Sequence, residues 1–190
     1  MIKAVIFDYF GVISSDEYWN MVKTDKSVTS DFLNIANRVN LGKLHWKDFV
    51  QTIAEKTGQT FEQVESMYAN EKINPQILAL AQELKNRYKT AILTNAHHEF
   101  LEPILKKTGI GDLFDATIIS SRVGVIKPDS KIFQITLKTL GVGPQEAVFI
   151  DDITRNVVGA EEAGLYAIHY RDMGSLKIAL SKLLGGKTKS

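Results

Sequence analysis

The chain has 190 residues, a formal net charge of +1 and no cysteine. This length allows one well-buried core with a modest insertion, and the balanced charge leaves no basic surplus for a nucleic-acid backbone. The lack of cysteine excludes disulfides, thiolate zinc sites and cysteine nucleophiles. No apolar run reaches the roughly 18 residues of a membrane span, and the chain opens on a strand-like run rather than a signal-peptide pattern. We therefore expect a soluble, cytoplasmic protein that binds neither nucleic acid nor membrane.

The first predicted strand is an apolar run that ends in a carboxylate. Residues 3–8 read Lys-Ala-Val-Ile-Phe-Asp, and Tyr9, Phe10 and Gly11 follow at once. An acidic side chain at the carboxyl end of a strand, before a turn on glycine, can serve as a nucleophile or a metal ligand. Asp8 is therefore the first candidate site residue.

Residues 14–74 show helical periodicity and no strand. One amphipathic helix is predicted to end at Gly42 and a second at Gly58, and Thr60–Gln63 matches a capping box for a third. An all-helical insertion directly after the first strand would overhang the carboxyl edge of the sheet.

Strand-like runs alternate with amphipathic helices from residue 75 onward. The predicted strands and helices fall, in chain order, at 75–88, 90–94, 99–108, 116–120, 129–140, 147–150, 156–163 and 166–170. This alternation indicates a parallel sheet with helices on both faces, an α/β fold. We expect residues 1–13 and 75–190 to form this core and residues 14–74 to form a separate helical domain.

Polar side chains follow the later strands at the point where each strand ends. They are a hydroxyl–amide pair, a cation and two carboxylates: Thr94, Asn95, Lys127, Asp151 and Asp152. Because the carboxyl ends of parallel strands meet at one edge of a sheet, we expect these side chains to lie close to Asp8. Such a set could hold a divalent cation and a phosphate group.

The same residues form four motifs in the order found in one protein family. The motifs read Phe7-Asp8-Tyr-Phe-Gly-Val12, Leu93-Thr94-Asn95, Lys127-Pro-Asp-Ser-Lys-Ile-Phe133 and Val148-Phe-Ile-Asp151-Asp152, followed by Asn156. Over nearly its whole length the chain resembles the haloacid dehalogenase-like (HAD) hydrolase superfamily. Its helical insertion matches the small cap of the subgroup with sugar-phosphate phosphatases, dehalogenases and epoxide-hydrolase phosphatase domains. The resemblance implies a Rossmann-like, five-stranded core.

The resemblance also implies a reaction, a cofactor and a role for each motif residue. Asp8 would attack phosphorus and form an aspartyl-phosphate that water then hydrolyses. A Mg²⁺ ion would be held by four groups, with Asp152 the direct ligand of the acidic pair: Asp8, the backbone carbonyl of Phe10, Asp151 and Asp152. The phosphate would be bound by three groups: Thr94, the backbone amide of Asn95, and Lys127. The implied substrate is a small phosphorylated metabolite.

Phe10 departs from the phosphatase pattern of this family. A second aspartate usually occupies this position, where it protonates the leaving oxygen and activates water. Positioned general acid–base catalysis is worth roughly 10²–10⁴-fold, so alkyl phosphomonoesters should turn over slowly. Three alternatives stay open: hydrolysis of acyl or aryl phosphates, 2-haloacid dehalogenation, and ligand binding without turnover.

The paired acids favour phosphoryl chemistry over dehalogenation. Halide displacement needs no magnesium, and dehalogenases of the family lack the metal carboxylates Asp151 and Asp152. Dehalogenases also carry an arginine shortly after the first motif, where this chain has Ser14, Ser15 and Asp16. Phosphatase activity is therefore the first prediction and dehalogenation the second.

Five further residues are candidates for secondary roles. Adjacent histidines in a helix point about 100° apart, so His97 and His98 are not expected to share one metal ion, although one could touch substrate. Asn156 is expected either to orient Asp152 or to cap a helix. Tyr18 and Trp19 lie near the start of the insertion and could face substrate.

Overall fold

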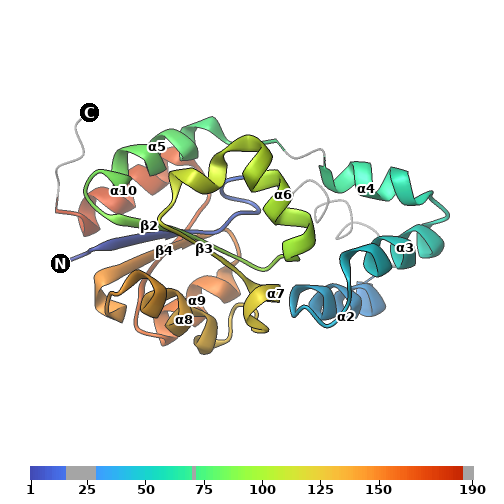
Figure 1. Cartoon of the computed structure of the whole chain (residues 1–190). Helices are drawn as coiled ribbons and strands as arrows, with labels where there is room; N and C mark the ends of the chain where they lie inside the picture. Colours follow the sequence, from blue (N-terminus) through green and yellow to red (C-terminus); the bar gives the residue numbers. More distant parts are fainter. Residues whose placement is uncertain (16–28, 70–71, 186–190) are drawn as a thin grey trace.

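The computed structural model describes residues 1–15, 29–69 and 72–185. Five parallel strands form one sheet in the order β3-β2-β1-β4-β5 (Figure 1). The strands are β1 (Ala4–Phe7), β2 (Lys89–Thr94), β3 (Ala116–Ile119), β4 (Ala147–Asp151) and β5 (Tyr166–His169). The prediction of a five-stranded parallel α/β core is confirmed. Strand β1, which Asp8 follows directly, is central in the sheet.

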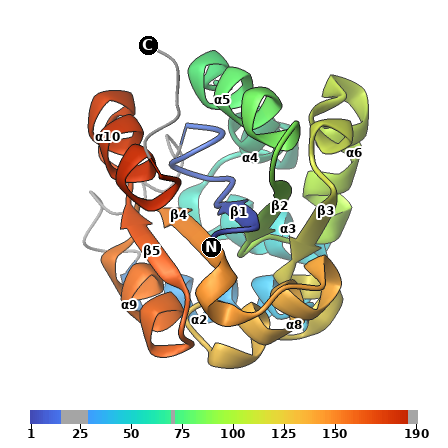
Figure 2. The ribbon, with the colours of Figure 1, turned by 90° about the vertical axis from the view of Figure 1, so that its left-hand side faces the viewer.

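Helices cover both faces of the sheet (Figures 1 and 2). One face carries α5 (Pro75–Lys85), α6 (His98–Thr108) and α10 (Met173–Leu183), and the other carries α8 (Ser130–Leu140) and α9 (Thr154–Glu162). Short helical turns complete the core at η1 (Ile110–Leu113), α7 (Ser120–Val123) and η2 (Pro144–Glu146). Within the described ranges, no helix combines the length and apolar character that a bilayer crossing requires.

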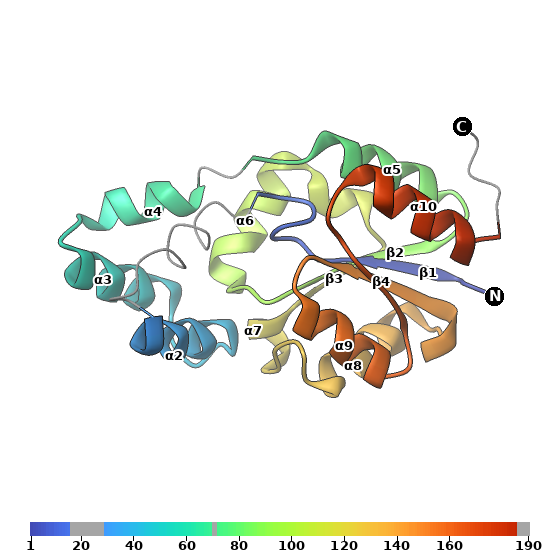
Figure 3. The same cartoon turned by 180° about the vertical axis from the view of Figure 1, so that it is seen from behind.

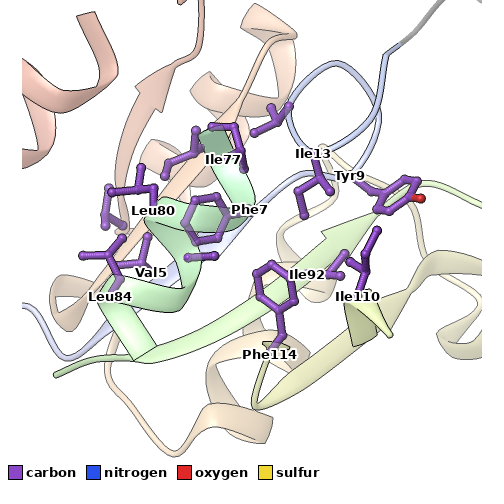
Figure 4. Close-up of a cluster of buried hydrophobic side chains, with 14 of the residues drawn as sticks. Val5, Phe7, Tyr9, Ile13, Ile77, Leu80, Leu84, Ile92, Ile110 and Phe114 are labelled. Atoms are coloured by element: carbon purple, nitrogen blue, oxygen red, sulfur yellow. The ribbon is translucent and has the colours of Figure 1, made fainter. Parts of the chain in front are cut away.

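The alternation of side chains along β1 explains why two apolar layers form. Val5 and Phe7 point into the layer beneath α5, α6 and α10, which Figure 4 shows in close-up. Ala4 and Ile6 point into the opposite layer, beneath α8 and α9. All four side chains are buried, as expected for a strand covered on both faces.

Helix α10 was not among the predicted elements. Asp172 caps its first turn by accepting a hydrogen bond from the Ser175 backbone amide at 2.8 Å. Its buried side chains, Leu176 and Leu180, are four residues apart and share one face. This cap and this spacing are a sequence signal that could have predicted the helix.

The described part of the predicted insertion contains three helices, which lie beyond the carboxyl ends of the strands (Figures 1 and 3). They are α2 (Thr29–Asn40), α3 (Trp46–Thr57) and α4 (Phe61–Ala69). The predicted capping box forms, since the Thr60 amide donates to the Gln63 side chain at 2.8 Å and the Gln63 amide donates to the Thr60 hydroxyl at 3.2 Å. These helices share an apolar cluster of their own, which includes Phe32, Phe49 and Val64.

The chain leaves the sheet and returns to it through two adjacent segments. Ser14 and Ile73 form an antiparallel bridge. The Ser15 amide donates to the Lys72 carbonyl at 2.8 Å, and the Asn74 amide donates to the Ile13 carbonyl at 2.8 Å. The two connections to the helical insertion therefore run side by side.

Candidate active site

Asp8 lies immediately after β1, at the edge of the sheet that faces the helical insertion. Its side chain is 6% exposed, and its Oδ1 accepts a hydrogen bond from the Tyr9 amide at 2.7 Å. The turn then passes through Gly11, whose φ is +79°. A Cβ at this position would overlap the carboxylate of Asp152. The turn thus requires glycine both for its backbone conformation and for the space that Asp152 occupies.

Lys127 joins Asp8 to Asp151. Its ammonium nitrogen lies 2.8 Å from Asp8 Oδ1 and 2.7 Å from Asp151 Oδ2. The lysine side chain is buried, and burial of an unpaired ammonium would be costly. The two carboxylates therefore fix both the charge and the position of this cation.

The backbone of Lys127 is held by the side chain of Asn95. Asn95 Oδ1 accepts from the Lys127 amide at 2.8 Å, and Asn95 Nδ2 donates to the Lys127 carbonyl at 3.1 Å. On the other side, Gly159 lets α9 approach the loop, because an added Cβ would lie 2.6 Å from Pro128 Cβ. Sequence reasoning gave Asn95 a backbone role and missed this double hydrogen bond of its side chain.

Asp151 is the most fully hydrogen-bonded acid of the site. Besides Lys127, the Ile153 amide donates to its Oδ1 at 2.7 Å. Asn156 Nδ2 lies 3.2 Å from Oδ1 and 3.0 Å from Oδ2. The expectation that Asn156 orients Asp152 or caps a helix is therefore wrong: it lies inside α9, and its amide reaches Asp151.

Asp152 completes a cluster of three carboxylates. One oxygen each from Asp8, Asp151 and Asp152 lie within 4.8 Å of one another, the one such group of metal-ligating side chains among the described residues. Nε2 of His169, at the end of β5, lies 2.8 Å from the Asp152 carbonyl oxygen. Strands β1, β4 and β5 thus fix the acidic cluster together.

The hydroxyl of Thr94 is buried and has no hydrogen-bond partner among the described residues. Thr94 is the last residue of β2, next to β1 in the sheet. An unsatisfied buried hydroxyl is costly, so its position at this edge is consistent with a ligand that would accept its hydrogen bond.

The combined effects of burial, neighbouring charges and hydrogen bonds raise the pKa of Asp8 and lower that of Asp151. Burial raises the pKa of Asp8 well above its ordinary value of 3.8, and the nearby Asp151 raises it further despite Lys127. Burial also raises the pKa of Asp151, but Lys127 and the hydrogen bonds to the carboxylate lower it by more. Burial lowers the pKa of Lys127, and the two carboxylates raise it by more, so the lysine stays charged.

The donor set fits a magnesium ion. Magnesium prefers oxygen ligands and binds through one or two carboxylates while keeping several waters. When all three clustered acids are ionised, they carry three negative charges against the single positive charge of Lys127. The space that Gly11 leaves beside Asp152 allows its carboxylate to approach the turn after Asp8.

The two histidines differ from expectation in their placement. His97 precedes α6 as its N-cap, and its Nδ1 accepts from the Glu99 amide at 3.3 Å. Since only His98 belongs to the helix, the predicted divergence of about 100° is wrong. The rings stack instead, with centroids 4.6 Å apart. Tyr18 and Trp19 lie outside the described residues.

Phe10 is half-buried and packs edge-on against Tyr9, with ring centroids 5.0 Å apart. Its side chain carries no proton donor, so the site lacks an acid two residues after Asp8. The side chains predicted for the site therefore converge on a cluster of charges and donors at one edge of the sheet, whereas the predicted role of Phe10 rests on its backbone carbonyl.

The sequence and fold of this chain match known proteins. The family profile for haloacid dehalogenase-like hydrolase matches residues 2–164. A sesquiterpene phosphatase, astK of Aspergillus oryzae, is 24% identical over 96% of this chain and 97% of its own length. Bifunctional epoxide hydrolase 2 of Sus scrofa is 27% identical over 97% of this chain, and the chain spans only 39% of that longer relative.

Solved structures show the same fold. The HAD family enzyme bt-2542 of Bacteroides thetaiotaomicron, in complex with magnesium and inorganic phosphate, superposes with a TM-score of 0.73. The match covers 93% of this chain and 99% of that enzyme, at 21% identity. The Rossmann-like core and the helices beyond its carboxyl edge therefore recur together in another protein.

Proposed function

Since the chain belongs to the haloacid dehalogenase-like hydrolase family, we propose that it is a magnesium-dependent phosphatase of a small phosphorylated metabolite. The observation that carries this proposal is the contact of the Lys127 ammonium with both Asp8 and Asp151, beside Asp152. A cation among carboxylates, at the same edge of the sheet as the unsatisfied hydroxyl of Thr94, suits a dianionic phosphate group. The phosphatase relative also supports it.

In this proposal Asp8 is the nucleophile that attacks phosphorus and carries the phosphoryl group as an aspartyl-phosphate. Lys127 lowers the pKa of Asp8 against the effect of burial and neutralises phosphate charge, which lowers the repulsion between an attacking anion and a dianion. Thr94 and the backbone amide of Asn95 donate to phosphate oxygens. The Asn95 side chain positions Lys127.

Magnesium would be held by the acidic cluster and the backbone carbonyl of Phe10, and it would neutralise charge on the phosphate. Asp152 is the acid we assign as a direct ligand together with Asp8. Asp151 already accepts hydrogen bonds from three groups, so its main task is to position Lys127. In this proposal the two adjacent acids therefore have different roles: Asp152 binds the metal ion and Asp151 positions Lys127.

The side chain of Phe10 narrows the substrate class. Without an acid at this position, the leaving oxygen must depart without a proton from the enzyme. Acyl and aryl phosphates have leaving groups stable enough to do so, whereas alkyl phosphates do not. We propose that the substrate is an acyl or aryl phosphate and that the protein acts on it in the cytoplasm.

A substrate panel with and without magnesium tests the proposal. Acetyl phosphate and p-nitrophenyl phosphate should be hydrolysed with magnesium, and both activities should vanish in EDTA and in Asp8→Asn. If neither compound is hydrolysed while magnesium still raises the unfolding midpoint, the protein is a binding module. Halide release from a 2-haloacid in EDTA would assign dehalogenation instead.

The variant Phe10→Asp tests the role of the missing acid separately. A restored acid should raise turnover of an alkyl phosphomonoester by at least tenfold, within the roughly 10²–10⁴-fold range of such catalysis. Phe10→Leu is the matched control, because it removes the ring and adds no proton donor. A gain of the same size in both variants would show that access, not acid catalysis, limits the wild-type protein.

A further inference from the structure

His169 holds the backbone of one member of the acidic pair at the end of β4. It is the last residue of β5, and it lies opposite Asp151 in the parallel pairing of β4 with β5. Its Nε2 atom lies 2.8 Å from the carbonyl oxygen of Asp152. A carbonyl oxygen can only accept a hydrogen bond, so Nε2 carries the proton and is the donor in this contact.

The peptide group that joins Asp152 to Ile153 is held at both ends. Its carbonyl accepts from His169, and its amide, from Ile153, donates to Oδ1 of Asp151 at 2.7 Å. Because a peptide group is planar, it cannot rotate without breaking at least one of these hydrogen bonds. The Cα atom of Asp152 lies in the same plane, so the two contacts also restrain the point from which the Asp152 side chain leaves the backbone.

The acids of the cluster are fixed in different ways. Asp8 and Asp151 are held through their carboxylates, which both contact the ammonium of Lys127. The carboxylate of Asp152 lies beside Gly11, where an added Cβ would be 2.4 Å from Asp152 Cγ. Magnesium demands near-ideal octahedral geometry, with oxygen ligands at about 2.0–2.1 Å. A small displacement of the Asp152 backbone would therefore be enough to spoil the fit of its carboxylate to the metal ion.

We propose that His169 is a positioning residue for Asp152, and that the affinity of the acidic cluster for magnesium depends on it. This inference rests on the proposed function, in which Asp152 is a direct ligand of the metal ion. Removing a group that holds a metal ligand in place typically weakens metal binding by roughly 10–100-fold. Replacing His169 removes no carboxylate from the cluster, so a loss of affinity would come from the changed position of Asp152.

Calorimetric titration of the full chain with magnesium chloride tests the inference. His169→Leu should weaken magnesium binding by roughly tenfold or more, because leucine cannot donate to the Asp152 carbonyl. His169→Gln should bind magnesium nearly as tightly as wild type, since the glutamine amide nitrogen can donate in place of Nε2. His169→Asn has a side chain one carbon shorter, which does not reach the carbonyl. It should show the same loss as His169→Leu, and it provides the test should the leucine variant fail to fold.

Tyr170→Phe is the matched control, because it removes one hydrogen bond at the next residue of the chain without changing the contact with Asp152. The Tyr170 hydroxyl accepts from Asn74 Nδ2 at 3.2 Å. The Tyr170 backbone amide donates to the Asp151 carbonyl at 2.9 Å, and the substitution keeps this amide. Unfolding midpoints in EDTA should fall in both Tyr170→Phe and His169→Leu, since each loses a hydrogen bond. Only His169→Leu should lose magnesium affinity.

The outcomes separate this inference from the proposed function. Equal magnesium affinity in wild type and His169→Leu would overturn the inference alone, because the cluster would bind its metal ion without help from His169. A loss in His169→Gln as large as in His169→Leu would also overturn it, since the hydrogen bond would not be the cause. An equal loss in Tyr170→Phe would show that stability, and not the position of Asp152, sets the affinity. A wild-type chain that binds no magnesium would overturn the inference and the proposed function together.

Discussion

Lys127 supplies one positive charge to a cluster of three carboxylates. Its ammonium contacts Asp8 and Asp151, and Asp152 adds a third negative charge within 4.8 Å. Like charges at this separation oppose folding unless a cation or a proton neutralises one of them. The arrangement that prepares the site for a phosphate and a metal ion is therefore a source of instability in the free protein, as is common at functional sites.

Asp8→Asn should abolish turnover and raise stability in EDTA. The pKa of Asp8 is raised in the folded protein, first by burial and then by Asp151. Its contribution to the free energy of unfolding is therefore fully present below the pKa of the unfolded state and is lost as the pH rises through the pKa of the folded state. The variant lacks this charge, so its advantage over wild type should grow with pH. Thermal unfolding measures the difference, since 1 kcal/mol shifts the unfolding midpoint of a chain of this size by about 2–4 °C. A lower midpoint for the variant than for wild type at neutral pH would contradict the prediction.

Gly11→Ala should remove the stabilisation that magnesium gives. Alanine at a φ of +79° costs about 1–2 kcal/mol in strain, and its Cβ would displace the Asp152 carboxylate. Gly58→Ala is the matched control, because Gly58 has a φ of +68° and nothing within 4 Å of an added Cβ. Both variants should unfold at lower temperature, but only Gly11→Ala should lose the magnesium-dependent rise in midpoint. If magnesium raised the unfolding midpoint of Gly11→Ala as much as that of wild type, Asp152 would not be a metal ligand.

Most of the site could be predicted from the sequence, because backbone topology decides where the ends of the strands meet. Asp8, Thr94 and Asp151 each end or follow a strand of one parallel sheet, so their proximity followed once the strands were recognised. The side-chain contacts of Asn95 and Asn156 were not predictable in this way. An amide can bond to many nearby groups, and its choice depends on side-chain geometry that no spacing encodes.

Helix α3 begins at a contact with the core of the protein. Its first amide, from Trp46, donates to Glu99 of α6 at 3.1 Å, and His45 Nδ1 lies 3.2 Å from the other oxygen of the same carboxylate. His45 itself makes no side-chain cap. Glu99 thus performs from another helix the task of an N-cap residue, where negative charge is favoured. The Trp46 ring stacks on Phe100 at 4.6 Å and extends this contact.

Glu99→Gln should lower stability by about 0.5 kcal/mol, a small value because the carboxylate is well exposed. The pKa of Glu99 is lowered from 4.5, first by the hydrogen bond with His45, so its contribution is present above the unfolded pKa and is lost as pH falls through the folded value. The difference from wild type should therefore be present at pH 7 and shrink below about pH 4.5. Unfolding midpoints at both pH values measure it, with the exposed Glu83→Gln as control.

Long, periodic elements were predicted closely, whereas α7 and α10 were not predicted. The strands and the helices α5, α6, α8 and α9 lie within a few residues of their predicted positions, because apolar periodicity and glycine ends mark them. α7 has only four residues, too few to show a period. Contacts such as that between Glu99 and Trp46 join segments 53 residues apart, and local sequence patterns carry no information about them.

The proposed catalytic edge lies between the sheet and the helical insertion. Parallel strands bring Asp8 and its partners to one end of the sheet, and α2, α3 and α4 lie beyond that end (Figure 3). The division of the chain into a core and a helical domain at residues 14–74 remains a prediction, and the two adjacent connecting segments make it directly testable.

Removing residues 16–71 and joining Ser15 to Lys72 through two glycines should leave the sheet core folded. Ser15 and Lys72 are already hydrogen-bonded through their backbones at 2.8 Å, so a short turn can close the gap without moving β1 or α5. The insertion has an apolar cluster of its own, and the layers on both faces of the sheet draw on residues outside it. Circular dichroism should show α/β structure with one cooperative unfolding transition, and magnesium should still raise the midpoint because the carboxylate cluster lies in the core. Loss of cooperative unfolding would show that contacts such as Trp46 with Phe100 are essential to the core, and that the chain folds as one domain.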